Sequence, residues 1–143
     1  MLTRKTINIV FISACFLIFY LTLYPETNFG VGEPDKGELN LIPFNTIINI
    51  VASTNLYRIL VNIGGNVLLF IPFGLLLPVN YINPHSLLKI TCIGCLLSIL
   101  IEVFQIFIPH RWTDIDDVFL NTIGTFLGYK LFQTYLINSY KYF

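Results

Sequence analysis

Residues 102–121 place groups capable of chemistry inside a segment that is otherwise apolar. Glu102 and Gln105 lie in one apolar run, a charged turn follows with Arg111 and Asp114, and Asp117 opens the next apolar run. A charged side chain inside the hydrocarbon of a membrane costs at least about 2.5–3.5 kcal/mol on insertion scales. We therefore expect these side chains to face one another or a wet cavity, and this is where the sequence predicts a functional site.

The residue types suit work on a phosphate-bearing lipid head group. Glu102 would act as a general acid or base, with Asp114 and Asp117 as further catalytic carboxylates. Arg111 offers a planar fork of donors suited to phosphate. Neutral amides would position the substrate: Asn40, Asn62, Asn66, Gln105 and Asn121. The sequence does not fix a cofactor, but the acids of the turn could hold a hydrated divalent cation such as Mg²⁺ through one or two carboxylates.

A purely structural interpretation competes with this one. Glu102 would form an ion pair with Arg111, and the amides would be interhelical hydrogen bonds worth about 0.6 kcal/mol each. The number of polar groups favours function, because one ion pair requires neither two asparagines on one span nor three acids in the turn. Among these acids, Asp116 is expected to face solvent, since Asp114 and Asp117 define the polar stripe of their helix.

The composition predicts an all-α, polytopic membrane protein, with residues 1–143 forming one domain. The chain is 55% hydrophobic and only 11% charged, whereas globular chains are roughly 25% charged. Its formal net charge of zero gives no electrostatic reason to expect a nucleic-acid partner. The cysteines Cys15, Cys92 and Cys95 all fall in apolar runs, so we interpret them as buried packing residues rather than as a metal or disulfide framework.

Four apolar runs approach the length of about 20 residues that a membrane-spanning helix needs. They cover residues 6–24, 58–78, 87–108 and 116–136. The first is predicted to be a signal anchor, because it is longer than the ~7–15 apolar residues of a signal peptide. Residues 40–53 mix apolar and amide side chains, which predicts an interfacial helix with Pro43 at its first position; a re-entrant segment is the alternative. The placement of Lys and Arg predicts that both termini are cytoplasmic.

Helical spacing would bring the polar groups together at one depth. Arg58, Asn62 and Asn66 follow an i, i+4, i+8 pattern and would form one stripe. With four spans, Asn66, Glu102 and Asn121 would all lie about 6–10 Å below the outer boundary of the membrane.

Small residues and a proline indicate how these helices would pack. Gly124 and Gly128 form the small-xxx-small pattern that lets membrane helices approach closely. Pro72 either kinks the second span or is an ordinary tolerated membrane proline.

Three stretches together carry a resemblance to a known family. They are Asn40-Leu-Ile-Pro-Phe44, then Asn62-x-x-x-Asn66-x-x-x-Phe70-Ile-Pro-Phe-Gly74, then Glu102-x-x-Gln105 continuing through Arg111, Asp114, Asp117, Asn121, Gly124 and Gly128. In these motifs, residues 40–132 resemble the VanZ-like family. The resemblance implies a small polytopic protein of the bacterial cell membrane that acts at the envelope. One member of the family is linked to teicoplanin resistance, and kinship to membrane enzymes that modify lipid head groups has been suggested.

Three functional classes remain open at this point. The first is a membrane enzyme or head-group binder acting on a membrane lipid or a polyprenyl-phosphate-linked precursor. The second is a non-catalytic accessory protein that shields such precursors or assembles with envelope machinery. A transporter is less favoured, because four spans without an inverted repeat rarely enclose a pathway. The sequence does not indicate an oligomeric state.

Overall fold

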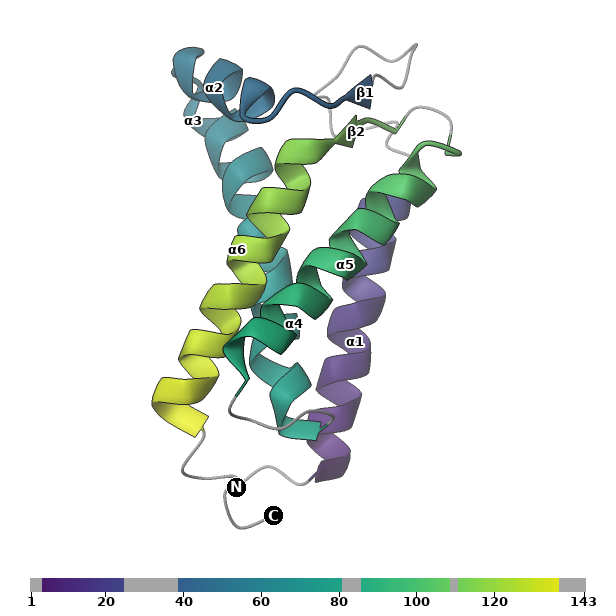
Figure 1. Ribbon diagram of the computed structural model, residues 1–143, viewed down its shortest axis with the longest axis vertical. Helices are drawn as coiled ribbons and strands as arrows, with labels where there is room; N and C mark the ends of the chain where they lie inside the picture. Colours follow the sequence, from purple (N-terminus) through teal and green to yellow (C-terminus); the bar gives the residue numbers. More distant parts are fainter. Residues whose placement is uncertain (1–3, 25–38, 81–85, 109–110, 137–143) are drawn as a thin grey trace.

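The chain folds into a bundle of helices with a short arm across one end (Figure 1). The computed structural model describes residues 4–24, 39–80, 86–108 and 111–136. The long helices of the bundle are α1 (Arg4–Leu23), α4 (Gly65–Asn80), α5 (Leu87–Gln105) and α6 (Ile115–Leu131). Short α3 (Leu56–Arg58) and the π-helix η1 (Ile59–Gly64) lead into α4, and a second π-helix, η2 (Phe132–Leu136), continues α6. The structure thus confirms the predicted helical class.

Three helical segments are long and apolar enough to cross a membrane among the residues described. They are Arg4–Leu23, Leu56–Val79 and Leu87–Gln105. Each matches one of the predicted spans. The fourth predicted span, 116–136, is helical and packs against α4 and α5, but it carries two acids in its first turn. Its passage across the membrane therefore stays a prediction.

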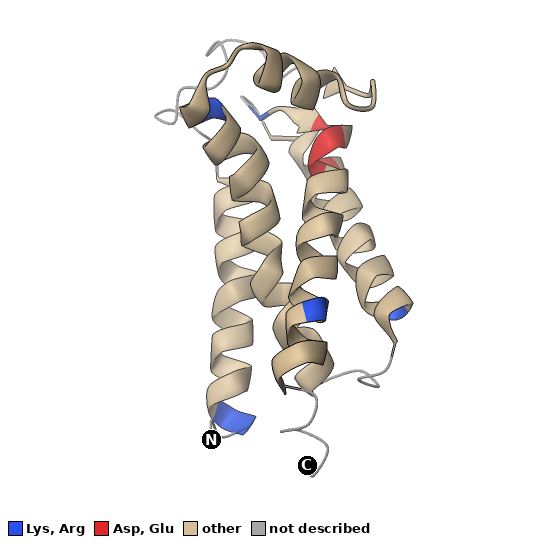
Figure 2. Cartoon of the chain, turned by 90° about the vertical axis from the view of Figure 1, so that its left-hand side faces the viewer, with Lys and Arg blue, Asp and Glu red and all other residues tan. Residues whose placement is uncertain are grey.

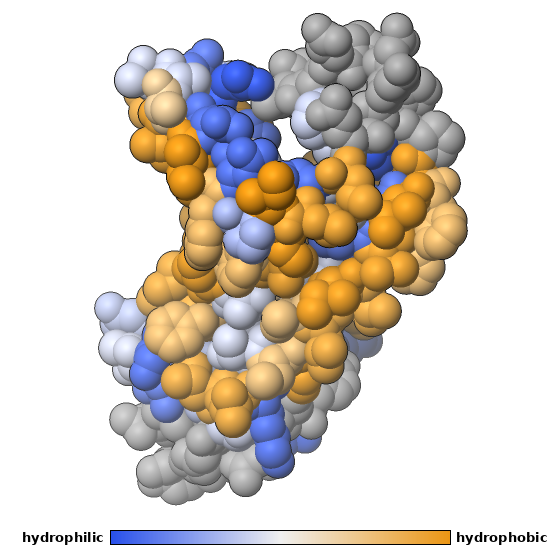
Figure 3. All heavy atoms as spheres, turned by 45° about the horizontal axis from the view of Figure 1, so that its top comes forward, coloured by the Kyte–Doolittle hydropathy of each residue, from blue (hydrophilic) through white to orange (hydrophobic). Residues whose placement is uncertain are grey.

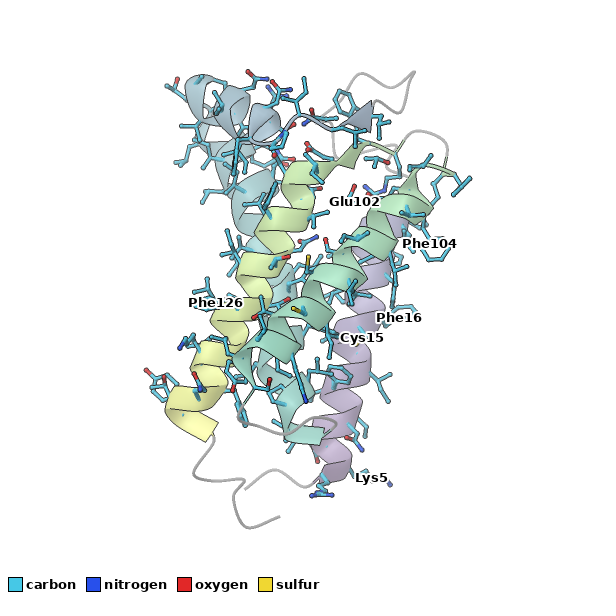
Figure 4. The ribbon with its side chains drawn as sticks, in the orientation of Figure 1. Lys5, Cys15, Phe16, Glu102, Phe104 and Phe126 are labelled. Atoms are coloured by element: carbon cyan, nitrogen blue, oxygen red, sulfur yellow. The ribbon has the colours of Figure 1, made fainter. Side chains whose placement is uncertain are left out.

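The outer surface of the bundle is apolar and the inner core is tightly filled. Phe16, Phe104 and Phe126 are exposed and point away from the bundle (Figure 4). Phe70 and Tyr129 are fully buried between the helices. Exposing so many apolar side chains would be unfavourable in water, whereas lipid tails are an apolar environment for them. This exposure fits the membrane assignment of the three long segments.

Glycines set the close contact between α4 and α6. A Cβ atom on Gly124 would collide with the carbonyl oxygen of Val67, and one on Gly128 would collide with the carbonyl oxygen of Ile71. The sequence predicted this role for both glycines. It did not single out Gly74 of α4, where a Cβ atom would collide with the backbone of Thr125 in α6. The two helices therefore touch backbone to backbone, as small residues allow in membranes.

The arm consists of β1 (Leu39–Asn40) and α2 (Asn45–Ala52). β1 pairs in parallel with β2 (Thr113–Asp114), in a register that places Asn40 opposite Asp114. The helix predicted within residues 40–53 is present and lies at the end of the bundle (Figure 1). Pro43, however, is not its first residue: α2 begins at Asn45, because Phe44 adopts a left-handed conformation with φ of 65° and turns the chain.

We predict that Gly124→Ala destabilises the bundle by about 1–3 kcal/mol, the range observed when extra atoms are forced into a packed interior. The measurement is thermal unfolding of the purified chain in detergent. Gly64→Ala is the matched control, because nothing lies within 4 Å of a Cβ atom there. Equal unfolding temperatures for the two variants would contradict the proposed backbone contact.

Candidate functional site

A cavity of about 600 Å³ lies between the arm and the bundle. Four parts of the chain supply its polar lining. They are β1 with Asn40, α2 with Asn45, Thr46 and Asn49, the α3–η1 segment with Arg58 and Asn62, and the segment leading into and starting α6 with Trp112, Asp114, Asp116 and Asp117. In the space-filling view, hydrophilic surface gathers at this end of the molecule and borders directly on apolar surface (Figure 3).

The cavity contains only part of the site predicted from the sequence. Its lining includes Asn40, Asn62, Asp114 and Asp117. The other predicted site residues are outside the lining: Glu102, Gln105, Asn66, Arg111 and Asn121. The polar groups predicted to lie together are therefore divided between a cavity and a set of buried contacts within the bundle.

Asp114 and Glu102 form the link between the cavity and the bundle. The Asp114 carboxylate accepts hydrogen bonds from the side-chain amide of Asn40 and from the backbone N–H of Asp116, both at 2.9 Å. It thereby caps the N-terminus of α6, as an Asp at this position commonly does. The backbone N–H of Asp114 donates to Glu102 Oε2 at 2.8 Å. Glu102 is buried and points between α5 and α6 (Figure 4).

Asp116 does not face solvent, so that prediction was wrong. Its side chain is 0% exposed, and its two oxygens accept the backbone N–H groups of Phe44 and Ile47 at 2.5 and 3.0 Å. The first N–H groups of a helix have no partner within the helix, and Asp116 supplies acceptors to α2 from α6. The stripe on α6 could not reveal this, because the donors lie about 70 residues away in the chain.

Asp117 is the acid best placed to meet a ligand. It lines the cavity, and its Oδ1 atom accepts a hydrogen bond of 2.5 Å from the Asn66 amide. Its Oδ2 atom accepts no hydrogen bond from the residues that the structure describes. Asn66 therefore orients the Asp117 side chain, and the second carboxylate oxygen can accept a hydrogen bond from a ligand.

The basic residue of the cavity is Arg58 rather than Arg111. Arg111 donates through Nη2 to the carbonyl oxygen of Leu21, which ties the start of β2 to the end of α1. Arg58 is exposed and lines the cavity at the end of α3, and the Asn62 amide donates to its carbonyl oxygen at 3.0 Å. The predicted stripe of Arg58, Asn62 and Asn66 assumed regular α-helix. The π-helix η1 interrupts it, so the first two line the cavity and Asn66 lies below.

Gln105 and Asn121 make buried contacts between helices. Gln105 Nε2 donates to the carbonyl oxygen of Thr22 at 2.8 Å, and Asn121 Nδ2 donates to Ser98 Oγ at 2.8 Å. Both side chains are buried within the bundle. Their geometry matches the structural alternative, in which amides join neighbouring helices.

Residues 11–137 match the VanZ/LLP1 family. The chain is also 33% identical to Protein VanZ of Enterococcus faecium over 131 residues, which cover 92% of this chain and 73% of that protein. The chain belongs to the VanZ/LLP1 family. Its membership and the three long apolar segments make it a membrane protein. No solved structure matches the chain.

In this VanZ-family chain, some acids of the cavity are already bound by donors of the protein, and one has an oxygen that can bind a ligand. Within the described ranges, no group of three or more His, Cys, Asp or Glu residues is placed to hold a metal ion. Asp114 and Asp116 are occupied by backbone and amide donors. We therefore assign no metal ligands, and Mg²⁺ remains an expectation from the sequence. What the cavity can offer a ligand is one oriented carboxylate, one guanidinium and several amides.

Several lining residues of this VanZ-family chain were not assigned to the site from the sequence. The sequence pattern put Arg58 in the stripe without a ligand role, put Asn45, Thr46 and Asn49 in the interfacial helix, and gave no role to Trp112. The mixture of amides with apolar residues along 45–53 was the available signal, but it shows only that the helix is amphipathic. Which of its faces would cover a cavity depends on the turn at Phe44 and on the β1–β2 pairing.

We predict that Asp116→Asn loosens the arm. One acceptor oxygen becomes an NH₂ group, so a buried backbone N–H loses its partner at a cost of about 1–3 kcal/mol. Hydrogen exchange should accelerate at the amides of Phe44 and Ile47. Asp117→Asn is the neighbouring control, because Asp117 holds neither amide; unchanged exchange in Asp116→Asn would contradict the proposed role of this carboxylate.

Proposed function

We propose that this VanZ-family protein binds the polar head group of an envelope lipid, or of a polyprenyl-phosphate-linked precursor, in the cavity beneath the α2 arm. The observation that carries the proposal is a polar cavity of about 600 Å³ at one end of an otherwise apolar bundle. Small-molecule sites generally enclose about 300–1,000 Å³. We also propose that occupancy of this cavity underlies a role in resistance to the glycopeptide teicoplanin.

The composition of the lining supports a lipid rather than a fully water-soluble ligand. Ile47, Ile50, Ile63 and Leu120 contribute apolar surface to the same cavity that Asp117 enters. A lipid combines a polar head with apolar chains, so it can satisfy both kinds of surface at once. Nearby apolar side chains such as Leu60 are exposed and would face the bilayer from which such a ligand arrives.

The cavity supports binding more directly than it supports catalysis. Glu102, the predicted acid or base, does not line the cavity and already accepts a backbone hydrogen bond. If the protein is an enzyme, Asp117 is the better candidate for the reacting carboxylate, because it lines the cavity and has an oxygen available. Binding without chemistry would serve the accessory role, in which the protein shields lipid-linked precursors.

The function can be tested through resistance. In cells that depend on this protein for teicoplanin resistance, Asn62→Ala and Asp117→Asn are expected to lower the inhibitory concentration toward that of cells lacking the protein. The physical reason is the loss of polar groups from the cavity lining. The measurement is teicoplanin susceptibility at equal abundance of each variant in the membrane.

The control for this test is Lys130→Gln, which changes a charge in the last turn of α6, whereas the cavity acid Asp117 lies in its first turn. This variant should retain full resistance. The proposal would be contradicted if the cavity variants kept full resistance as well, or if resistance were lost to the same degree in the control.

We further propose that the cavity opens toward the outside of the cell and that both termini are cytoplasmic. Lys5 lies at the end of the bundle opposite Glu102 (Figure 4), and Arg4 and Lys89 begin helices at that same end. Cytoplasmic loops carry the excess of Lys and Arg. A green fluorescent protein fused to the carboxy terminus should therefore fluoresce, and an alkaline phosphatase fused there should be inactive. Active phosphatase at that position would reverse the proposed orientation.

A further inference from the structure

The charged groups of the cavity come from different helices. Arg58 ends α3, whereas Asp117 belongs to the first turn of α6. Figure 2 shows acidic residues gathered at the end of the bundle that carries the arm. The two side chains line the same cavity, and no ion pair joins them among the contacts of the described residues. A ligand held between them would therefore meet a positive group at one place and a negative group at another.

The α6 side of the cavity suits a cation. Asp117 offers a carboxylate oxygen that accepts no hydrogen bond from the described residues, and an ammonium bound to it would stabilise its ionised form. Trp112, in the chain segment that enters α6, lines the same cavity. The face of an indole ring attracts ammonium groups. A carboxylate and an indole in one cavity form a suitable environment for an amine.

The α3 and α2 side of the cavity suits a phosphate. Arg58 provides the guanidinium, whose planar fork matches phosphate oxygens. Asn45, Asn49 and Asn62 provide side-chain amides. Each NH₂ group already donates one hydrogen bond, to Asn40, to Asn45 and to the Arg58 carbonyl oxygen respectively. Its second N–H can donate to the remaining phosphate oxygens. These residues belong to elements that carry no acid within the part of the chain that the structure describes.

The balance of charge argues against a purely anionic head group. The lining contains three carboxylates and one guanidinium. Asp114 and Asp116 are fixed by neutral donors, so their negative charge is not cancelled by a cation at those hydrogen bonds. The Arg111 guanidinium outside the lining offsets part of the charge of Asp117, but carboxylates still outnumber guanidinium groups around the cavity. A ligand carrying phosphate alone would meet this negative excess, and one carrying an amine alone would leave Arg58 without a counter-charge.

We infer that the head group taken by this cavity is zwitterionic, with a phosphate bound by Arg58 and an amine bound by Asp117 and Trp112. The inference rests on the proposed function, because it names the class of head group that the lipid carries. A phospholipid with an aminoalkyl phosphate head group has this chemistry. A free aminoalkyl phosphate shares it, and the experiment separates the two sources.

The experiment is native mass spectrometry of the full chain in detergent, titrated with lipids that have identical acyl chains. The probes are phosphatidylethanolamine, its N-acetyl derivative, which keeps the phosphate but lacks the ammonium, and phosphatidylglycerol. Phosphatidylethanolamine should bind about tenfold more tightly than the other two, since a hydrogen bond to a charged partner contributes that much or more. Glycerophosphoethanolamine should bind far more weakly than the lipid.

Two variants assign the groups. Asp117→Asn should remove the preference for phosphatidylethanolamine over its N-acetyl derivative. Arg58→Gln should weaken all three lipids by a similar factor and preserve the preference, because each carries a phosphate. Arg58 is exposed, so its variant tests the site even if Asp117→Asn folds poorly. Lys130→Gln should bind as the unchanged chain does.

The outcomes separate the inference from the function on which it rests. Equal binding of phosphatidylethanolamine and phosphatidylglycerol, with both weakened by Arg58→Gln, would overturn the zwitterionic head group but keep head-group binding. Lipid binding that no cavity variant alters would overturn both. If glycerophosphoethanolamine bound as tightly as the lipid, the ligand would be a soluble phosphoamine and the lipid would be excluded.

Discussion

The structure depends on how the first backbone amides of α2 are satisfied at the end of an apolar bundle. These groups have no partners within their own helix, and leaving one buried without an acceptor is costly. Asp116 on α6 accepts the amide of Ile47 in the first turn of α2 and that of Phe44 just before the helix. Asp114 binds Asn40 at the adjoining strand pair. The same turn that starts α6 therefore holds the arm in place. Without these hydrogen bonds the arm would have no fixed position, and it would no longer cover the cavity.

A second constraint fixes the helices that carry the cavity carboxylate and the amide that orients it. The glycines of α4 and α6 bring the two backbones into contact, which sets the distance between the helices that carry Asn66 and Asp117. At this distance their side chains meet at 2.5 Å. Larger residues at the glycine positions would move the helices apart and change the orientation of the cavity carboxylate. Packing deep in the bundle thus determines the geometry of a site near its end.

Local patterns predicted the helices well and the site only in part. Apolar length located the three long helical segments, and the spacing of Gly124 and Gly128 located the contact with α4. Hydrogen-bond partners were not predictable in the same way. Asp116 bonds to residues about 70 positions away, and no helical period encodes such a contact. The π-helix likewise gave Arg58 and Asn66 different environments although their spacing suggested one stripe.

The pairing of β1 with β2 also determines the order in which the molecule can be completed. Residues 40 and 114 are partners, so everything between them is a closed loop in the finished fold. During synthesis the arm emerges from the ribosome well before its acceptors on α6 exist. Contacts between such distant segments form late, because a long loop must close first. The cavity therefore forms only after α6 has been made, and a truncated chain lacking α6 would carry every residue of the arm without the site that the arm covers.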